Sequence, residues 1–554
     1  MIDNNEITKL PDRETMSFDV VIVGAGPAGL SAAIRLKQLD SNVSVVVIEK
    51  GAEVSSHIIS GAIMDVSAIS ELIDNWKSDP ESPFHTVVTD DNHIFLTANR
   101  AVKIPKWLYP KIFKNKNGYI ISLGHCCQWL AKIAENLGVE IYPGFAGAEL
   151  LYENDKVIGV ATGDMGLDKE GRFNSNSIRG MALLAKYTLL AEGAKGSLTK
   201  QVIKKFDLDK NAQVAKYALA FKEIWKIDQK FHNKGEVNHY LGWPLNDKAG
   251  GGFIYHAKDN LLYVGYVVHL DYKNPYLSPF NEFQKFKTHP KIVNILQNAS
   301  RVAYGARVVN EGGWQSVPKV TFAGGAILGC SAGFMNNLRL KGSHNAIRSG
   351  KLVAETIIEA FKENRENDDL VKYNEGWKLS AIGKELYLVR NFKPLLEKLG
   401  IKTALMLTTL DIFTQKYLKF SFFGTLKHNN SDAKSLVKAN QAEIINYTKA
   451  DGKITFDRLS SIALTNVNYS PQPNHLKVKN YQIQKSIEYG EFAGPSTRYC
   501  PAAVYDWVKQ DDEISYIINS DNCIQCKTCD IKDPTNNIDW QVPYGGDGPL
   551  YKQM

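Results

Sequence analysis

The fold of this 554-residue chain is decided by one stretch near its start, Asp19-Val-Val-Ile-Val-Gly24-Ala-Gly26-Pro-Ala-Gly29-Leu-Ser-Ala-Ala33. The apolar run before the first glycine is typical of a parallel strand that is covered on both faces. Gly24 makes a tight turn, Gly26 lets the backbone approach a pyrophosphate, and Gly29 lets a helix pack closely on the strand. Free N–H groups at the helix start then attract the anion. We therefore predict a dinucleotide-binding strand, turn and helix.

The residues that follow this fingerprint favour FAD over NAD. A second apolar strand ends at Glu49, where a carboxylate is suited to bind ribose hydroxyls. The chain carries one such fingerprint, so no second site for NAD(P)H is evident. Residues 187–194 and 320–326 are typical of the returning parts of an FAD fold, although either one alone also fits a glycine-rich connection in the core. Outside the fingerprint, the predicted cofactor-binding residues include Glu49, Lys50, Gly61, Gly193 and Gly325.

A cysteine pattern near the end of the chain indicates a second redox centre. Cys500-Pro501 is followed by the run Cys523-Ile-Gln-Cys526-Lys-Thr-Cys529. Ferredoxin cubanes draw three thiolates from such a run and one from a remote Cys-Pro. Zinc sites usually use two separated pairs or add His, and disulfides do not fit a large chain with seven cysteines. We therefore predict one [4Fe–4S] cluster, bound by Cys500, Cys523, Cys526 and Cys529.

Composition bounds the class of protein. A chain of 554 residues with 44% hydrophobic residues is long enough for two or three domains with sizeable cores. The net charge of +7 is mildly basic, but no nucleic-acid-reading motif accompanies it, so we expect no nucleic-acid partner. Residues 1–18 have the pattern of neither a secretory signal nor a transit peptide.

Two segments indicate contact with a membrane surface, although no stretch has the roughly twenty apolar residues of a spanning helix. Residues 92–134 contain no acidic residue, and their basic side chains alternate with aromatic and aliphatic ones. Residues 384–427 combine apolar runs with flanking lysines, as in a helix that lies in the membrane interface. Either segment alone equally fits a core helix with a solvated basic face. The basic residues of the first segment are Arg100, Lys103, Lys106, Lys111, Lys114 and Lys116.

Several longer strings have counterparts in one known family. They include Gly242-Trp-Pro-Leu245, Leu270-Asp-Tyr-Lys-Asn-Pro-Tyr276, Gly329-Cys-Ser-Ala-Gly-Phe-Met-Asn336 and Cys526-Lys-Thr-Cys-Asp-Ile-Lys-Asp-Pro534. With these strings, the chain resembles the electron transfer flavoprotein–ubiquinone oxidoreductases along nearly its whole length.

The resemblance implies an α/β fold (α+β overall). It has a Rossmann-like FAD domain, an intertwined ubiquinone-binding domain and a C-terminal ferredoxin-like [4Fe–4S] domain. The expected divisions are 17–95, 121–200 and 301–375 for the FAD domain, 96–120 for a membrane-facing loop, 201–300 for the ubiquinone-binding domain, 376–440 for an amphipathic membrane-associated helical segment, and 441–554 for the ferredoxin-like domain.

The resemblance also implies roles for particular residues. Gly250 and Gly251 would lie at the quinone headgroup, and Asn336 would contact the flavin ring. Tyr505 and Thr528 would lie near the cluster, where hydrogen bonds toward sulfur raise its potential. No catalytic acid–base residue is expected.

The implied activity is electron transfer from reduced electron transfer flavoprotein to ubiquinone through FAD and one [4Fe–4S] cluster. We expect a monomer bound to one leaflet, on the cytoplasmic face of a bacterial inner membrane, or on the matrix face of the mitochondrial inner membrane in a eukaryote. One alternative is an FAD-dependent prenyl-chain reductase of the geranylgeranyl type, which generally lacks the cysteine-bearing domain. The other alternative is a redox sensor without turnover.

Overall fold

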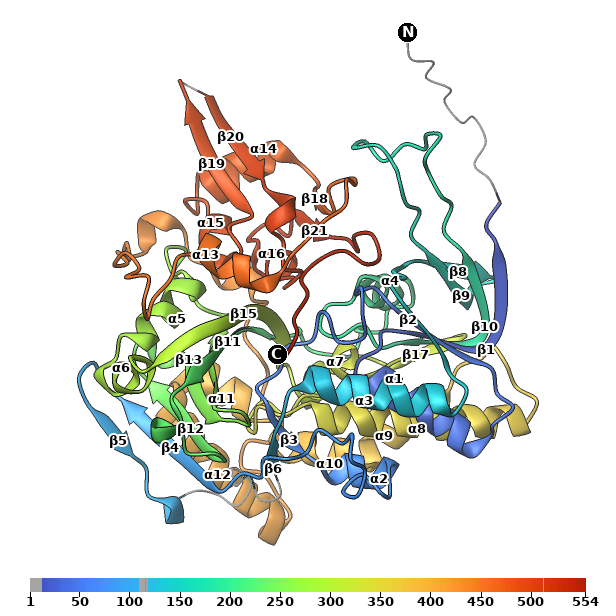
Figure 1. Cartoon of the computed structure of the whole chain (residues 1–554), viewed down its shortest axis with the longest axis horizontal. Coiled ribbons are helices and arrows are strands. Elements are labelled where there is room, and N and C mark those ends of the chain that lie inside the picture. Colours follow the sequence, from blue (N-terminus) through green and yellow to red (C-terminus); the bar gives the residue numbers. More distant parts are fainter. Residues whose placement is uncertain (1–11, 109–114, 116–117, 512) are drawn as a thin grey trace.

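The computed structural model describes residues 12–108, 115, 118–511 and 513–554. Figure 1 shows a sheet with long helices packed against it, a second sheet beside it, and an orange-to-red C-terminal region above both. The end of the chain returns to the centre of the molecule (Figure 1).

The glycine fingerprint forms the middle of the first sheet. Its elements are β1 (Thr15–Val23), α1 (Pro27–Leu39), β2 (Val45–Glu49), α3 (Leu123–Asn136), β7 (Glu140–Pro143), β8 (Gly147–Glu153), β9 (Lys156–Thr162), β10 (Ala182–Leu190), α4 (Ser197–Lys205), β16 (Thr321–Phe322), β17 (Gly325–Ile327), α7 (Gly329–Ala332) and α8 (Ser343–Lys362). The strand order is β16-β17-β10-β1-β2-β7, with β1 parallel to both β2 and β10. Val20, Val21 and Ile22 are fully buried, as expected for a strand covered on both faces, and α1 packs between α3 and α8.

The second sheet is mostly antiparallel. Its strands are β4 (Asp90–Leu96), β5 (Ala101–Lys103), β11 (Tyr217–Ile227), β12 (Glu236–Gly242), β13 (Asn246–His256), β14 (Leu261–His269) and β15 (Ala299–Asn310), in the order β15-β11-β14-β13-β12-β4-β5. Only its β4–β12 pair is parallel among the pairs of described residues. The expected division at residue 95 falls inside β4, because the end of the first segment joins this sheet.

Side chains of the second sheet alternate between two surroundings, as the period of a strand requires. Tyr240, Tyr266 and Phe221 lie in one cross-strand row and are buried in a core with Phe283 and Phe286. The last two belong to α5 (Pro279–Lys287), which with α6 (Pro290–Leu296) packs on this sheet. The neighbouring row of side chains faces the first sheet, so the interior between the two sheets is lined by both.

The structure describes the second predicted membrane segment fully and the first only in part. Residues 384–427 form separate helices rather than one: α10 (Ala381–Leu388), α11 (Phe392–Leu399) and α12 (Ile401–Phe413), which follow α9 (Val371–Leu379). Gly400, at φ +77°, separates the last two. Across the described part of the chain, no helix is long and apolar enough to cross a membrane. In the first segment, Tyr109, Pro110, Lys111, Ile112, Phe113, Lys114 and Lys116 lie outside the described residues.

The C-terminal region consists of short elements. They are α13 (Arg458–Ile462), β18 (Leu476–Val478), α14 (Tyr481–Ile483), α15 (Ser496–Tyr499), β19 (Tyr505–Gln510), β20 (Glu513–Ile518), α16 (Cys529–Lys532) and β21 (Ile538–Trp540). Tyr551 and Met554 of the tail pack with side chains of the second sheet. The tail also bonds to segments that flank the first sheet: the Tyr551 N–H donates to the Ser56 carbonyl (2.9 Å), and the Ser122 hydroxyl donates to the Met554 carbonyl (3.2 Å). The predicted mixed α/β architecture is confirmed.

Candidate functional site

A cavity of about 300 Å³ lies between the two large sheets. Gly24, Gly26 and Glu49 line it from the first sheet, and His239 and Tyr255 line it from the second. This volume is at the lower end of the range for small-molecule sites, which are mostly apolar with a few polar groups. One hollow therefore joins the glycine fingerprint to the strands of the second sheet.

The three fingerprint glycines fit the predicted dinucleotide site. Gly24 has φ +110°, and a Cβ there would lie 2.6 Å from the Ala191 carbonyl oxygen. A Cβ on Gly29 would lie 2.1 Å from the carbonyl oxygen of Gly24. By contrast, Gly26 borders open space and is the N-cap of α1 without a side-chain cap. The first N–H groups of α1 are thus left for an anion, as the pyrophosphate of FAD requires.

A buried ammonium group gives a second indication that the cavity holds a polar ligand. Lys222 lines the cavity, and within the described residues its Nζ has no hydrogen-bond partner. It lies 4.0 Å from the centre of the Tyr263 ring, and burial lowers its pKa to about 7. Because an unpaired buried donor is costly, an oxygen of a bound ligand would satisfy it. The free N–H groups at the start of α1 and the unpaired Lys222 Nζ therefore fit a ligand with oxygen acceptors, as FAD has.

Two further predicted cofactor residues lie directly after β2. Glu49 lines the cavity, with its carboxylate accepting from the N–H groups of Ala25 (3.0 Å) and Gly51 (2.8 Å). Lys50 also lines it, but its Nζ contacts His57 Nδ1 (2.5 Å) and the amide oxygen of Gln525. Burial, reinforced by Arg307, holds the Lys50 pKa well below its ordinary value. Lys50 therefore lies between the cavity and the loop that carries the C-terminal cysteines.

The other predicted cofactor residues lie in different surroundings. Gly61 and Gly193 line the cavity. Gly325 lies within β17, where a Cβ would meet the Thr188 carbonyl oxygen at 2.2 Å, and it is not among the lining residues. Asn336 is fully buried and donates to Glu385 Oε1 (2.7 Å), while its neighbour Met335 lines the cavity. Direct cofactor contacts of Gly325 and Asn336 stay predictions.

The predicted quinone glycines lie on β13 beside the cavity wall, and neither is among the lining residues. A Cβ on Gly250 would lie 1.8 Å from the Val267 carbonyl oxygen, so a side chain is excluded there. Gly251 pairs with Val267, which lines the cavity together with Phe253. The contact of the two glycines with a quinone stays a prediction.

The four predicted cluster ligands are brought together. Cys500, Cys523, Cys526 and Cys529 are buried, are not in disulfides, and line one small hollow. Backbone N–H groups of Ala502 and Gln525 point to the sulfurs of Cys500 and Cys523, each at 3.4 Å. Burial raises the pKa of Cys526 to about 12, with Cys500 adding to the effect. Thiolates so close together require a cation, so this donor set fits an iron–sulfur cluster.

The two predicted tuning residues belong to the same hollow. Thr528 is fully buried, and its hydroxyl lies 3.3 Å from Cys526 Sγ. Tyr505 is buried and lines the hollow; burial also holds its pKa well above the ordinary value, and the charge of Cys529 adds to this. The Thr528 hydroxyl thus lies within reach of a sulfur, whereas the buried Tyr505 hydroxyl has no hydrogen-bond partner among the described residues. That either hydroxyl tunes the cluster stays a prediction.

Sequence reasoning did not assign the residues that connect the thiol hollow to the cavity. Lys527, between two cluster ligands, lines both spaces, as does Trp540. The Lys527 Nζ donates to the Ala194 carbonyl (3.2 Å) and lies 4.7 Å from the centre of the Trp540 ring. Because Lys527 lies inside the cysteine run, the sequence alone could have indicated that it borders the cluster. Arg307 and His239 offered no comparable local signal.

A glycine-lined FAD cavity beside four buried thiols defines an iron–sulfur flavoprotein. Residues 452–552 match the family described as "Electron transfer flavoprotein-ubiquinone oxidoreductase, 4Fe-4S", residues 217–309 match "ETF-QO, ubiquinone-binding", and residues 19–96 match "FAD binding domain". The chain therefore belongs to the electron transfer flavoprotein–ubiquinone oxidoreductase family, and its cofactors are FAD and a [4Fe–4S] cluster.

Individual relatives agree with this assignment. The chain is 46% identical to the electron transfer flavoprotein–ubiquinone oxidoreductase of Pseudomonas aeruginosa, over 98% of this chain and 100% of the relative. It is 44% identical to the human mitochondrial one, over 98% of this chain and 90% of the relative. A solved structure of a geranylgeranyl bacteriochlorophyll reductase-like protein from Thermoplasma acidophilum covers 73% of this chain and 98% of its own, with 18% identity and a TM-score of 0.50. That last likeness concerns the fold alone.

Proposed function

We propose that the protein accepts electrons from reduced electron transfer flavoprotein and reduces ubiquinone to ubiquinol. The single observation that carries this proposal is the shared cavity. Residues of the FAD fingerprint, residues of the ubiquinone-binding segment and Lys527 of the cysteine run all line it. Residues that bind the cofactors and residues of the ubiquinone-binding segment thus border one cavity. No observation favours the prenyl-chain reductase or the sensor as a second function.

In this proposal the cofactors supply the electron chemistry, since FAD stores one or two electrons and the cluster stores one. The chain positions the two groups. The start of α1 and Glu49 orient the nucleotide, and the four cysteines hold the cluster. Lys527 and Trp540 exclude water from the short segment between the two sites, where both residues are buried. Electrons can therefore pass through the protein without exposure to solvent.

At the other end of the cavity, flat side chains suit a quinone ring. Phe253 and Tyr255 stack with ring centres 4.6 Å apart, and both line the cavity. Gly251 pairs with Val267, which also lines the cavity, so the two glycines lie beside this surface. We propose that the quinone headgroup lies against this surface, and that the ubiquinone-binding unit includes β4 and β5 in addition to residues 201–300.

We also propose that the protein binds one leaflet of a membrane. Large apolar side chains are exposed on and after α12, among them Met406 (65%) and Phe422 (62%), and Trp107 of the other segment is 81% exposed. The two segments are adjacent, because Lys402 Nζ lies 4.5 Å from the centre of the Phe95 ring. Exposed apolar residues flanked by lysines are typical of helices that lie in the membrane interface.

The cellular setting proposed from the sequence is a monomer on the cytoplasmic face of a bacterial inner membrane, or on the matrix face in a mitochondrion. A reducing compartment suits the buried thiols of the cluster. Ubiquinone, with its long apolar tail, enters most directly from a bilayer on which the protein lies.

The test is steady-state reduction of a short-tailed ubiquinone by the detergent-purified, cluster-intact protein. Reduced electron transfer flavoprotein and NADH are compared as donors. We expect turnover with the flavoprotein and none with NADH, because the chain carries one dinucleotide fingerprint. Turnover with NADH alone, or with neither donor, would contradict the proposed function.

A further inference from the structure

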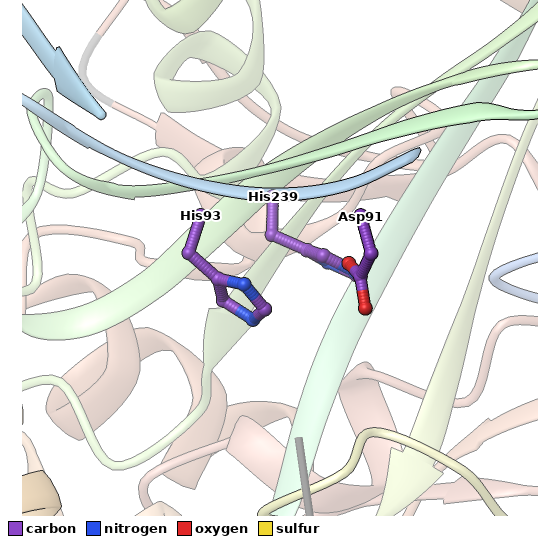
Figure 2. Close-up of side chains that lie close together, drawn as sticks. All are labelled: Asp91, His93 and His239. Carbon is purple, nitrogen blue, oxygen red and sulfur yellow. The ribbon is translucent and has the colours of Figure 1, made fainter. Parts of the chain in front are cut away.

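A polar group of side chains lies on the face of the second sheet that borders the cavity. His93 and His239 are direct partners across the parallel β4–β12 pair, and Asp91 precedes His93 by two residues on the same face. Figure 2 shows the side chain of His239 between those of His93 and Asp91. Tyr255 reaches the group from β13. Sequence reasoning assigned no role to any of these residues.

The contacts within the group form a continuous line. Tyr255 Oη lies 3.3 Å from His239 Nδ1, and His239 Nε2 lies 3.7 Å from Asp91 Oδ1. The other carboxylate oxygen of Asp91 accepts from the backbone N–H (3.1 Å) and the side-chain amide (2.9 Å) of Asn115. The Lys341 ammonium donates to the amide oxygen of Asn115. Asp91 is thus held in place while it faces the imidazole.

The line of contacts begins at the proposed quinone surface and ends away from it. Tyr255 and His239 line the cavity beside Phe253, whereas Asp91 is not among the lining residues. The side chains of His239 and Asp91 are 17% and 18% exposed. Both His239 and Tyr255 fall within the segment that matches the ubiquinone-binding family. The group is therefore placed to connect the quinone surface with the outside.

We propose that His239 and Tyr255 deliver protons to the quinone oxygen, and that Asp91 orients His239 and stabilises its protonated form. This inference rests on the proposed function. Ubiquinone takes up two electrons, supplied by the reduced cofactors, and two protons, which must come through the protein. In each transfer the Nδ1 proton of His239 moves to Tyr255 Oη while the Tyr255 hydroxyl proton moves to the quinone oxygen. The transfer leaves His239 neutral with its one proton on Nε2. A flip of the ring then turns that N–H toward Tyr255, and the free nitrogen takes the next proton from solvent on the Asp91 side.

The protonation of His239 depends on the charge of the quinone, so proton uptake is linked to electron transfer. Burial holds the pKa of His239 well below its ordinary value, and His93 and Lys341 lower it further. The groups that face His239 are Asp91 and His93 from β4, Tyr255 from β13, and Lys341. Before electrons arrive, the imidazole is therefore neutral. The negative charge that the quinone gains raises the proton affinity of His239, so proton uptake follows electron arrival.

A metal ion is the competing interpretation, since Asp91, His93 and His239 each offer a ligand atom and these atoms lie within 4.8 Å of one another. The two imidazoles are stacked, with ring centres 4.9 Å apart and planes inclined by 26°. Ring nitrogens bind metal in the plane of the ring, and two nearly parallel planes do not meet at a shared ion. The positive charge of Lys341 also opposes a cation. Proton transfer therefore fits this geometry better.

The test compares His239→Gln and Tyr255→Phe with the control His232→Gln, which changes a histidine outside the cavity lining. We expect kcat for ubiquinone to fall about 100-fold in His239→Gln, as for loss of a proton-transfer group, with KM nearly unchanged. Oxidation of the reduced protein by ferricyanide, which accepts electrons without protons, should stay at the wild-type rate. The solvent deuterium isotope effect on quinone reduction should rise in both variants and not in the control.

Other results of these measurements would contradict the proton relay or the proposed function. Equal kcat and isotope effects in His239→Gln and wild type would overturn the relay, and so would parallel losses with quinone and ferricyanide. Binding of one Zn²⁺ per chain that is lost in His239→Gln, together with loss of wild-type activity in chelator, would overturn it in favour of a metal site. If wild type reduces no quinone with either donor, the proposed function fails first. FAD and iron content, measured in every variant, separate these results from misfolding.

Discussion

The cluster hollow and the quinone wall of the cavity are built in opposite ways. Three of the four cluster ligands come from one run, Cys523–Cys529, so their chemistry is visible in the sequence. At the proposed quinone surface, His239 and Tyr255 line the cavity and Asp91 lies behind His239; the three come from three strands, and only the register of the sheet brings them together. Local motifs therefore identify cofactors, whereas the groups that handle the substrate become evident only in the fold.

The largest expected effect comes from a substitution in the cysteine run. Cys526→Ala removes one of the four buried thiolates predicted to bind the cubane and leaves one iron without its protein ligand. We expect loss of the cluster's iron, of its visible absorption and of its electron paramagnetic resonance signal. Cys126→Ala, which changes a buried cysteine on α3 outside the hollow, is the matched control and should keep its iron. Full iron content in Cys526→Ala would show that the ligand assignment is wrong.

Loss of FAD is expected from a change at the other local motif. Gly29→Val places a Cβ 2.1 Å from the carbonyl oxygen of Gly24, so the turn and the start of α1 must move apart. We expect purified protein with less than about a tenth of the wild-type FAD, since the displaced N–H groups no longer meet the pyrophosphate. In the control Gly163→Ala, the new Cβ meets its nearest atom at 3.7 Å and FAD content should be normal. Normal flavin in Gly29→Val would refute the fingerprint.

Membrane binding depends on neither motif and gives a smaller expected effect. Met406→Glu combined with Phe422→Glu puts two charges on the exposed apolar surface. Each large apolar side chain contributes about 1.5–3 kcal/mol on burial, so binding to anionic vesicles should weaken about 100-fold or more in flotation assays. Ile178→Glu, in the loop before β10, changes an equally exposed residue (69%) and should have no effect. Equal weakening by both changes would point to general charge repulsion instead.

The smallest expected effect concerns the reduction potential of the cluster. Thr528→Ala removes the hydroxyl that lies 3.3 Å from Cys526 Sγ. A hydrogen bond of about 1 kcal/mol corresponds to roughly 40 mV for a one-electron couple, so the cluster potential should fall by about that much. Redox titration followed by electron paramagnetic resonance measures the shift. Val504→Ala, in the same hollow but without a polar group, should leave the potential within error. A rise in Thr528→Ala would reverse the proposed direction.

Sequence reasoning identified the family, the two cofactors and the mixed fold, because glycine turns and cysteine spacings are local. Contacts that depend on tertiary structure could not be predicted in this way. The position of Lys50 after β2 did not reveal that its ammonium group turns toward Gln525. The buried amide of Asn336 is used by Glu385, a partner on α10 far along the chain. The division placed at residue 95 falls within β4, since strand pairing crosses the expected domain boundary.

The central claim is that one cavity links the cofactors to ubiquinone, and it is tested most directly by a single reaction. Protein reduced with a stoichiometric amount of dithionite is mixed with a short-tailed ubiquinone in a stopped-flow instrument, and flavin absorbance is followed. We expect reoxidation at least as fast as steady-state turnover with electron transfer flavoprotein. Reoxidation slower than turnover, or none, would contradict it, because the flavin would then lie outside the path to quinone.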